Sequence, residues 1–449
     1  MIARIAKGLT WFISRYLPDP LVFAILLTIV TFAAGIAALG GTDMPPPLLE
    51  RPALMVKMWG DGFWNLLAFS MQMALVVVTG HALASSGPVK NIMRATASLA
   101  RTPAQGVMLT TCVGAVACVL NWGFGLVVGA MFAREVARRV KGSDYRLLIA
   151  SAYIAFLTWH GGLSGSVPLL AATPGNPMEK TVGLIPARDM LLSGYNLFIT
   201  IALIVTLPFL TRMMMPAPGE VVSVDPALLA EEPDFQKTLA PDAPIAERLE
   251  ESRLLAWVVG ALGLASLGLY FRSKGFNITI NTVNLFFLTL GIILHKTPMA
   301  YARAVSAAAR STAGIMIQFP FYAGIQLMME HSGLGGLITE FFINISTKET
   351  FPILTFFSSA IVNFAVPSGG GHWVVQGPFV MPAAQALGAD LGKAAMAIAY
   401  GEAWMNMAQP FWALPALAIA GLGVRDIMGY CVTALLFSCA IFVVGLAVF

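Results

Sequence analysis

The stretch 363–378 reads NFAVPSGGGHWVVQGP and lies between strongly apolar segments. Glycines let a ligand approach backbone N–H groups, because no side chain stands in the way. Prolines free backbone groups that a straight helix would consume. Amides and helix amino termini attract anions, whereas carbonyl oxygens can hold a cation. We therefore predict a binding site for a small acid or ion at this stretch, with these candidate residues: Asn363, Pro367, Ser368, Gly369, Gly370 and His372.

Three further stretches interrupt apolar segments in the same way: NWGFG at 121–125, TWHGGLSGS at 158–166 and GEAWMNMAQP at 401–410. Their neutral polar groups could bind a carboxylate or a coupling cation, or they could satisfy backbone groups that each break leaves free. Their aromatic residues could line a pocket for a short acyl chain or simply pack. The candidates from these stretches are Asn121, Trp122, Gly123, Thr158, Ser164, Ser166, Asn406 and Gln409.

Three ionisable residues lie inside the interrupted segments: His160, His372 and Glu402. An ionisable residue within a membrane is a functional candidate by default. A histidine could couple transport to protons or neutralise a bound carboxylate, but a neutral, hydrogen-bonded structural role is the alternative. Glu402 could carry a proton, bind a cation or pair with a helix end. Because no arginine or lysine lies deep in these segments, we expect a small monocarboxylate rather than a dicarboxylate.

These residues must be positioned by membrane helices. Of the 449 residues, 57% are hydrophobic and 11% are charged, and the mean hydropathy is +0.78. Soluble domains carry about 25% charged residues. The apolar runs are long and continuous rather than alternating, which indicates helices and not a barrel. The net charge of +4 fits basic cytoplasmic loops, and we expect no nucleic-acid partner.

The fold class that we predict is an all-α polytopic membrane protein with two inverted-topology repeats. The halves are residues 1–215 and 254–449, joined by an acidic soluble linker at 216–253. Each half has a re-entrant hairpin followed by an unwound transmembrane helix, at about 106–133 and 147–177 and again at about 351–387 and 393–421.

The order of matching motifs in the two halves and the positions of basic residues support this interpretation. Asn121 and Asn363 lie 242 positions apart, and Tyr153 and Tyr400, each in an Ala-Tyr pair, lie 247 apart. Basic residues flank both ends of the first hairpin, which predicts entry from the cytoplasm. The second hairpin follows a span that leaves a basic turn, so it should enter from the opposite side. Broken helices at matching positions of inverted halves indicate a substrate site near the bilayer midplane.

Two other function classes fit the sequence poorly. A hydrolase within the membrane needs a nucleophile with a base, or a metal-binding pattern such as HExxH, and neither is present. A passive channel would not need four breaks around one site. We therefore predict a secondary transporter and no enzyme.

Long strings throughout the chain identify a resemblance. They include RYLPDPLVFA, MVKMWGDGFWNLLAFSMQMAL, NWGFGLVVGAMFAREVARRV, AATPGNP, GFNITINTVN, NFAVPSGGGHWVVQGPF and AYGEAWMNMAQPFWALPALAIAGLGVRDIMGY. From end to end the chain resembles the bacterial short-chain fatty acid transporter family, often called AtoE-type, which is grouped with the ion-transporter superfamily.

The resemblance implies uptake of butyrate, acetoacetate and similar acids through the bacterial cytoplasmic (inner) membrane. It also implies symport, an elevator-like movement and a homodimer. A carrier of dicarboxylates or other organic anions is the alternative. Many superfamily members bind a carboxylate and sodium at Ser-Asn-Thr hairpin tips, but here the tips read NWG and PSGGG. The coupling ion, H⁺ or Na⁺ at the hairpin tips, therefore stays open, and no other cofactor is expected.

Overall fold

A computed structural model describes residues 1–449 except 1, 17, 19, 42–43, 177, 225–234, 236, 276–278, 365, 368 and 410. Every regular element within the described part is a helix. The first elements are α1 (Ile2–Tyr16), α2 (Pro20–Ala38), η1 (Leu39–Gly41), α3 (Arg51–Gly62), α4 (Leu67–Ala84) and α5 (Gly87–Ala97). They are followed by α6 (Pro103–Leu120), α7 (Trp122–Arg139), α8 (Tyr145–Ile154), η2 (Ala155–Gly161), α9 (Ser166–Ala171), α10 (Glu179–Val182), α11 (Ala187–Leu191) and α12 (Gly194–Met213).

Short elements lead from there into the second half: η3 (Pro218–Glu220) and α13 (Ile245–Glu250). The second half contains α14 (Arg253–Lys274), α15 (Ile280–His295), α16 (Pro298–Ala309), η5 (Arg310–Thr312), α17 (Ala313–His331), α18 (Leu334–Asn344), α19 (Phe351–Asn363) and α20 (Gly369–Ala386). The last elements are α21 (Leu391–Met405), η6 (Phe411–Ala413), α22 (Leu414–Ala420) and α23 (Val424–Val448).

Several helices have the length and composition of membrane spans. Within the described residues six qualify: Leu21–Gly41, Pro103–Leu120, Tyr145–Ala171, Gly194–Met213, Ile245–Lys274 and Val424–Val448. A run of about 20 apolar residues is long enough to cross a bilayer. The chain is therefore a multi-pass helical membrane protein, as its composition predicts.

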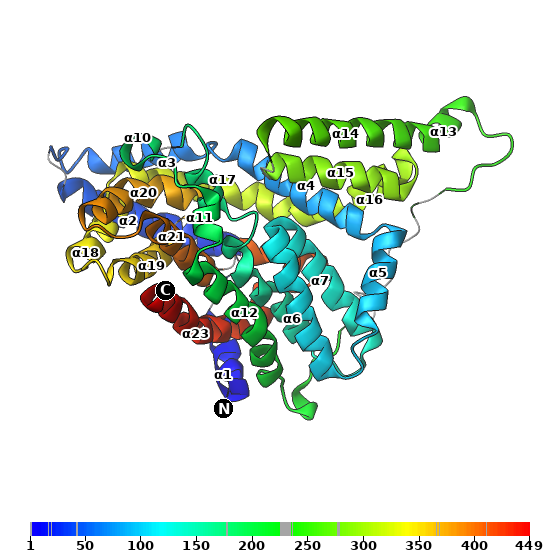
Figure 1. Ribbon diagram of the computed structural model, residues 1–449, viewed down its shortest axis with the longest axis horizontal. Coiled ribbons are helices and arrows are strands. Elements are labelled where there is room, and N and C mark those ends of the chain that lie inside the picture. The colour runs from blue at the N-terminus through cyan, green and yellow to red at the C-terminus, as the bar shows by residue number, and fades with distance from the viewer. Residues whose placement is uncertain are drawn as a thin grey trace.

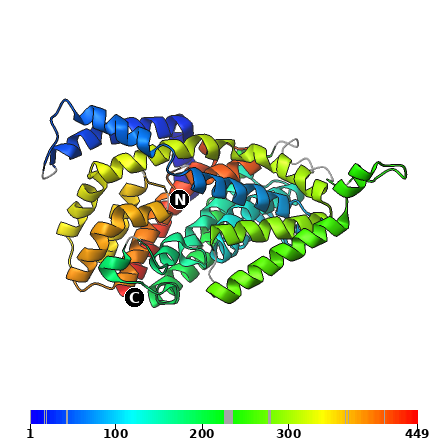
Figure 2. The same ribbon diagram turned by 90° about the horizontal axis from the view of Figure 1, so that it is seen from above.

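The helices form an outer layer and an inner bundle (Figures 1 and 2). In the outer layer α14 packs on α15, and α15 packs on α4. The inner bundle contains the pair α6 and α7, which pack on α8, and the group α19, α20 and α21. The N-terminal helix α1 packs along the C-terminal helix α23 (Figure 1).

Local sequence fixes where the inner helices begin. Thr102 and Asp144 cap α6 and α8 by accepting hydrogen bonds from backbone N–H groups in their first turns. Asp390 does the same for α21. Such caps satisfy donors that have no partner within the helix. These caps fix the residues at which the helices leading into the interrupted stretches begin.

The helix ends differ in detail from the boundaries of the polar stretches. The first hairpin breaks at Asn121 alone, because α7 starts at Trp122 and runs through the glycines of NWGFG. In the second half α21 continues through Gly401 to Met405. A Cβ on Gly401 would lie 2.2 Å from the carbonyl oxygen of Phe356 in α19. That glycine therefore permits close packing of two helices and does not break one.

Candidate functional site

A histidine and a glutamate meet where the two halves of the chain join. Nε2 of His160, in η2, lies 2.9 Å from Oε2 of Glu402, in α21. Both side chains are 0% exposed. A fully buried polar contact of this kind is expensive to separate, because removing one partner leaves the other without its hydrogen bond. Sequence reasoning singled out both residues, and the structure brings them together.

An amide and an indole N–H group bind the second oxygen of the Glu402 carboxylate. Its Oε1 accepts hydrogen bonds from Nδ2 of Asn406 at 3.0 Å and Nε1 of Trp412 at 3.3 Å. Nδ2 of Asn363 donates to Oδ1 of Asn406 at 2.8 Å and to the backbone oxygen of Glu402 at 3.2 Å. Asn363 and Asn406 are themselves fully buried. This polar network connects the end of α19 to the end of α21.

The glycine-rich start of α20 closes against the histidine. A Cβ on Gly369 would lie 2.7 Å from Cε1 of His160 and 3.1 Å from Cβ of Ser166 at the start of α9. A Cβ on Gly370 would face Leu170 at 3.3 Å. Glycine is needed here because any side chain would push α20 away from the ring. Nδ1 of His160 is buried and has no hydrogen-bond partner among the described residues.

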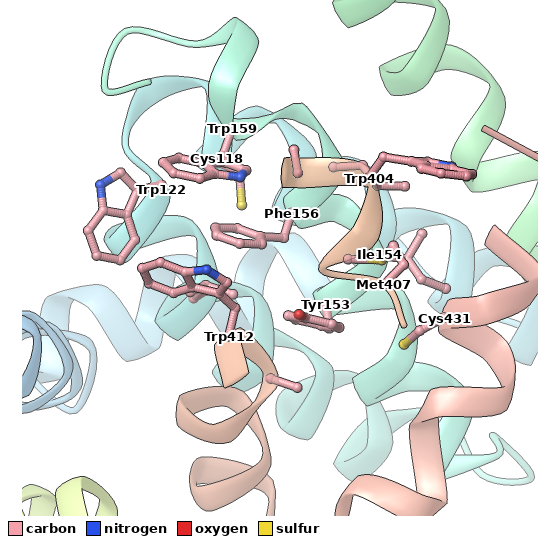
Figure 3. Close-up of a cluster of buried hydrophobic side chains, with 14 of the residues drawn as sticks. Cys118, Trp122, Tyr153, Ile154, Phe156, Trp159, Trp404, Met407, Trp412 and Cys431 are labelled. Carbon is pink, nitrogen blue, oxygen red and sulfur yellow. The ribbon is translucent and has the colours of Figure 1, made fainter. Parts of the chain in front are cut away.

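Aromatic rings gather next to His160, and Figure 3 shows Trp122, Phe156, Trp159 and Trp412 side by side in this cluster. Phe156 and Trp159 stack with an interplanar angle of 4° and a centroid distance of 5.2 Å. Trp412 lies 5.2 Å from Trp122 and 6.0 Å from Trp159. The Trp159 ring lies 3.6 Å from the His160 ring. Because these residues are buried, they exclude water and strengthen the electrostatic interactions of the pair.

Residues at the first hairpin tip satisfy the backbone. Asn121 is extended and half-buried, and its Oδ1 accepts a hydrogen bond from N of Phe124 at 2.9 Å. Oγ of Ser164 accepts from N of Trp122 at 2.9 Å. A Cβ on Gly123 would lie 2.3 Å from Val76 of α4. This tip is thus anchored to the unwound segment on one side and to the outer layer on the other.

Three other candidates have protein partners of their own. The hydroxyl of Thr158 donates to the carbonyls of Ala115 and Ala155, both at 3.0 Å. Nε2 of Gln409 donates to the Tyr322 hydroxyl at 3.2 Å. His372 is buried, and its Nε2 lies 3.1 Å from the backbone oxygen of Ser359.

The two remaining candidates lie in the connection between α19 and α20. Pro367 is buried there, and Ser368 lies outside the described residues.

Two tyrosines tie the broken segments across the halves. The Tyr153 hydroxyl donates to the backbone oxygen of Asn406 at 2.8 Å. The Tyr400 hydroxyl donates to Oδ1 of Asn196 at 2.6 Å, and Nδ2 of Asn196 donates to the backbone oxygen of Gly161 at 3.0 Å. Sequence reasoning used the tyrosines only as repeat markers and missed Asn196. An amide within the apolar helix 194–213 was the signal available.

Apolar helices long enough to cross a bilayer, with interruptions around a buried histidine–glutamate pair, define a multi-pass membrane protein. The whole chain, residues 1–449, matches the family described as short chain fatty acid transporter. The protein belongs to the short-chain fatty acid transporter family.

Two relatives match along essentially their whole length. A protein of Escherichia coli (strain K12) is 73% identical over 449 residues, covering 100% of both chains. A protein of Haemophilus influenzae (strain ATCC 51907 / DSM 11121 / KW20 / Rd) is 66% identical over 453 residues, covering 99% of both. Both are provisionally named short-chain fatty acid transporters.

Among solved structures, the YdaH transporter of Alcanivorax borkumensis aligns with 96% of this chain and 97% of its own. The sequence identity is 17% and the TM-score is 0.49.

Proposed function

We propose that this protein is a secondary active transporter that imports butyrate, acetoacetate and similar short-chain monocarboxylates through the bacterial cytoplasmic membrane. Transport is symport with a cation, and the coupling ion is the proton. Two inverted repeats move in an elevator-like manner within a homodimer. Family membership supports the substrate class. The buried pair of His160 and Glu402 carries the proposal of proton coupling.

The geometry of the pair suggests how a proton and a carboxylate are coupled. The His160 imidazolium and the ionised Glu402 neutralise each other while the site is empty. An entering substrate carboxylate competes with Glu402 for the imidazolium. Glu402 would then stay buried with its charge uncompensated, which is costly, so it takes up a proton. One carboxylate and one proton thus occupy the site together, and the charge inside the bundle does not change.

The start of α20 supports the position of the carboxylate. A helix amino terminus favours negative charge, and at Gly369 and Gly370 no side chain covers the first N–H groups of α20. A Cβ on Gly369 would face Cε1 and Nε2 of the His160 ring, and Nδ1 of the same ring is buried. The described residues contain no lysine or arginine among their buried side chains. A site made of dipoles and one histidine suits a single carboxylate better than two.

The test is radiolabelled butyrate uptake into proteoliposomes under separately imposed pH and sodium gradients. We expect accumulation when the outside is acidic and none from a sodium gradient alone. Glu402→Gln should abolish accumulation but retain butyrate exchange, because a permanently neutral residue 402 still permits substrate binding. Glu340→Gln, at an exposed position of α18, is the matched control and should behave as the wild type.

Accumulation driven only by sodium would refute proton coupling. Succinate competing as well as butyrate would refute the monocarboxylate assignment.

A further inference from the structure

The N-terminal helix has the composition of an interfacial membrane helix. α1 carries the basic residues Arg4, Lys7 and Arg15 and no acidic residue. Its large exposed apolar side chains are Ile5 (41% exposed), Trp11 (61%) and Phe12 (54%). Basic residues together with exposed Trp or Phe are typical of helices that bind at the boundary between lipid headgroups and acyl chains.

α1 is held against the rest of the protein and is not a loose extension. It packs along α23, with Ala6 fully buried. A Cβ on Gly429 of α23 would lie 2.3 Å from Cα of Thr10, so the two backbones touch. The exposed side chains of α1 are therefore presented in a fixed orientation.

A cavity of about 580 Å³ opens beside α1, between the start of α8, the segment after α12 and α23. Its lining combines cations with apolar surface. The residues that matter are Arg4, Lys7, Arg146, Trp11, Met214 and Tyr430. A cavity with both kinds of lining fits an amphipathic anion better than a purely polar one.

Asp144 lies behind two residues that line the cavity, Arg146 and Val222, and holds both in place. One carboxylate oxygen of this buried residue accepts from N of Leu147 at 3.0 Å. The other accepts from N of Val222 at 2.9 Å and from the Arg146 guanidinium at 3.0 Å. Asp144 therefore fixes Arg146 and the segment after α12 in place. Both of its carboxylate oxygens are occupied by these hydrogen bonds.

Positive charge is in excess at the mouth of the cavity. Lys7 pairs with Glu220 at 2.5 Å, but both side chains are largely exposed, and such pairs contribute little. Arg4 forms no ion pair with any described residue. The lining carries three cations, Arg4, Lys7 and Arg146, and one carboxylate, Glu220, while Asp144 holds Arg146 from behind. An anion that reaches this cavity is favoured electrostatically.

We propose that this cavity binds an anionic phospholipid of the surrounding membrane, such as phosphatidylglycerol. Arg4 and Lys7 hold the headgroup phosphate, Arg146 lies behind them, and the lipid chains extend along the apolar side chains of α1. The exposed Trp11 and Phe12 favour a lipid over a small soluble anion, because only a lipid also covers apolar surface.

The test measures lipid binding directly, by native mass spectrometry of the full-length protein. Phosphatidylglycerol and phosphatidylcholine are titrated separately. We expect the wild type to bind phosphatidylglycerol at least tenfold more tightly. The double variant Arg4→Gln, Lys7→Gln should lose about tenfold of that affinity. The matched control is Arg272→Gln, Lys274→Gln, two exposed charges at the end of α14, and it should bind as the wild type does.

A second variant tests the apolar contribution. Trp11→Ser should weaken phosphatidylglycerol binding by several fold without changing the thermal unfolding temperature. Equal binding of the two lipids by the wild type would overturn the proposal, as would unchanged binding by the double variant. Glycerol phosphate competing at the same concentration as the lipid would also overturn it, because the site would then recognise a soluble anion.

Discussion

The breaks at Asn121 and Asn363 use the same residue type for different purposes. Asn121 is half-buried between α6 and α7, and its side chain caps the helix that follows it. Asn363 is fully buried at the end of α19, and its side chain reaches Asn406 and the backbone of Glu402 in α21. The first asparagine organises its own hairpin, whereas the second organises the neighbourhood of an acid.

The acid–base pair shows the same division between the halves. His160 follows Asn121 by 39 positions, and Glu402 follows Asn363 by 39 positions. Equal spacing thus places a base in one half and an acid in the other, and the fold brings them to 2.9 Å. Neither half could form the pair alone, so a movement of one half relative to the other would act on it directly.

Replacing each asparagine is the strongest test of this comparison. Asn363→Ala removes two buried hydrogen bonds and leaves Oδ1 of Asn406 without that donor, which should cost about 2–3 kcal/mol. Asn121→Ala removes a helix cap, which typically costs about 1 kcal/mol. We expect Asn363→Ala to lower the unfolding temperature in detergent more than Asn121→Ala does. We also expect Asn363→Ala to reduce butyrate uptake at least tenfold.

Asn363→Leu serves as the control, because it keeps the volume of the side chain but removes the donor. It should resemble Asn363→Ala in uptake. Equal effects of the two alanine substitutions on both measurements would contradict the division of roles between the asparagines.

Much of the fold could be predicted because membrane helices are recognisable in a sequence as long apolar runs. The runs that became α2, α12, α14 and α23 are long and carry few charges, so their existence followed from hydropathy. Exact breaks were harder to predict. The glycine at 401 was interpreted as an interruption, but glycine also serves close helix packing, and only the neighbouring α19 decides between the two.

The two residues of the buried pair could be singled out from the sequence, but their contact could not. Hydropathy marks Glu402 as an acid in an apolar run, yet it cannot say which base lies opposite. The equal 39-residue intervals were a usable signal for pairing His160 with Glu402. No comparable pattern predicts that Trp412 donates to Glu402. A tryptophan near a break can pack against its neighbours just as well as donate a hydrogen bond.

Gly401 and Gly123 allow the packing of the two halves to be compared. Gly401→Ala would place Cβ 2.2 Å from a backbone oxygen of α19, so the two helices must separate. Overpacking of this kind costs about 1–3 kcal/mol. Gly123→Ala would meet Cγ1 of Val76 at 2.3 Å and Oδ1 of Asn121 at 3.5 Å, which are side-chain atoms and not backbone. We expect Gly401→Ala to lower the unfolding temperature by several degrees and to slow uptake, and Gly123→Ala to change both much less.

The larger variant Gly401→Val provides a graded control and should be worse than Gly401→Ala. A Gly401→Ala protein as stable as the wild type would show that α19 and α21 can move apart freely, in which case their contact does not hold Glu402 in place.

The smallest expected effects come from the two tyrosines, where the halves should behave alike. Tyr153→Phe removes the hydrogen bond to Asn406, and Tyr400→Phe removes the one to Asn196. Each loss should cost about 1 kcal/mol, as is usual for one hydrogen bond between membrane helices. Both rings stay buried, so packing is preserved. We expect each variant to lower the unfolding temperature by a similar few degrees.

The double variant decides whether the two contacts act independently. They involve different helix ends and share no residue, so their effects on unfolding should add. A loss in the double variant that is clearly smaller than the sum would mean that releasing one broken segment already releases the other. The halves would then be coupled through the site itself, and the separate roles assigned to their asparagines would have to be replaced by a single shared one.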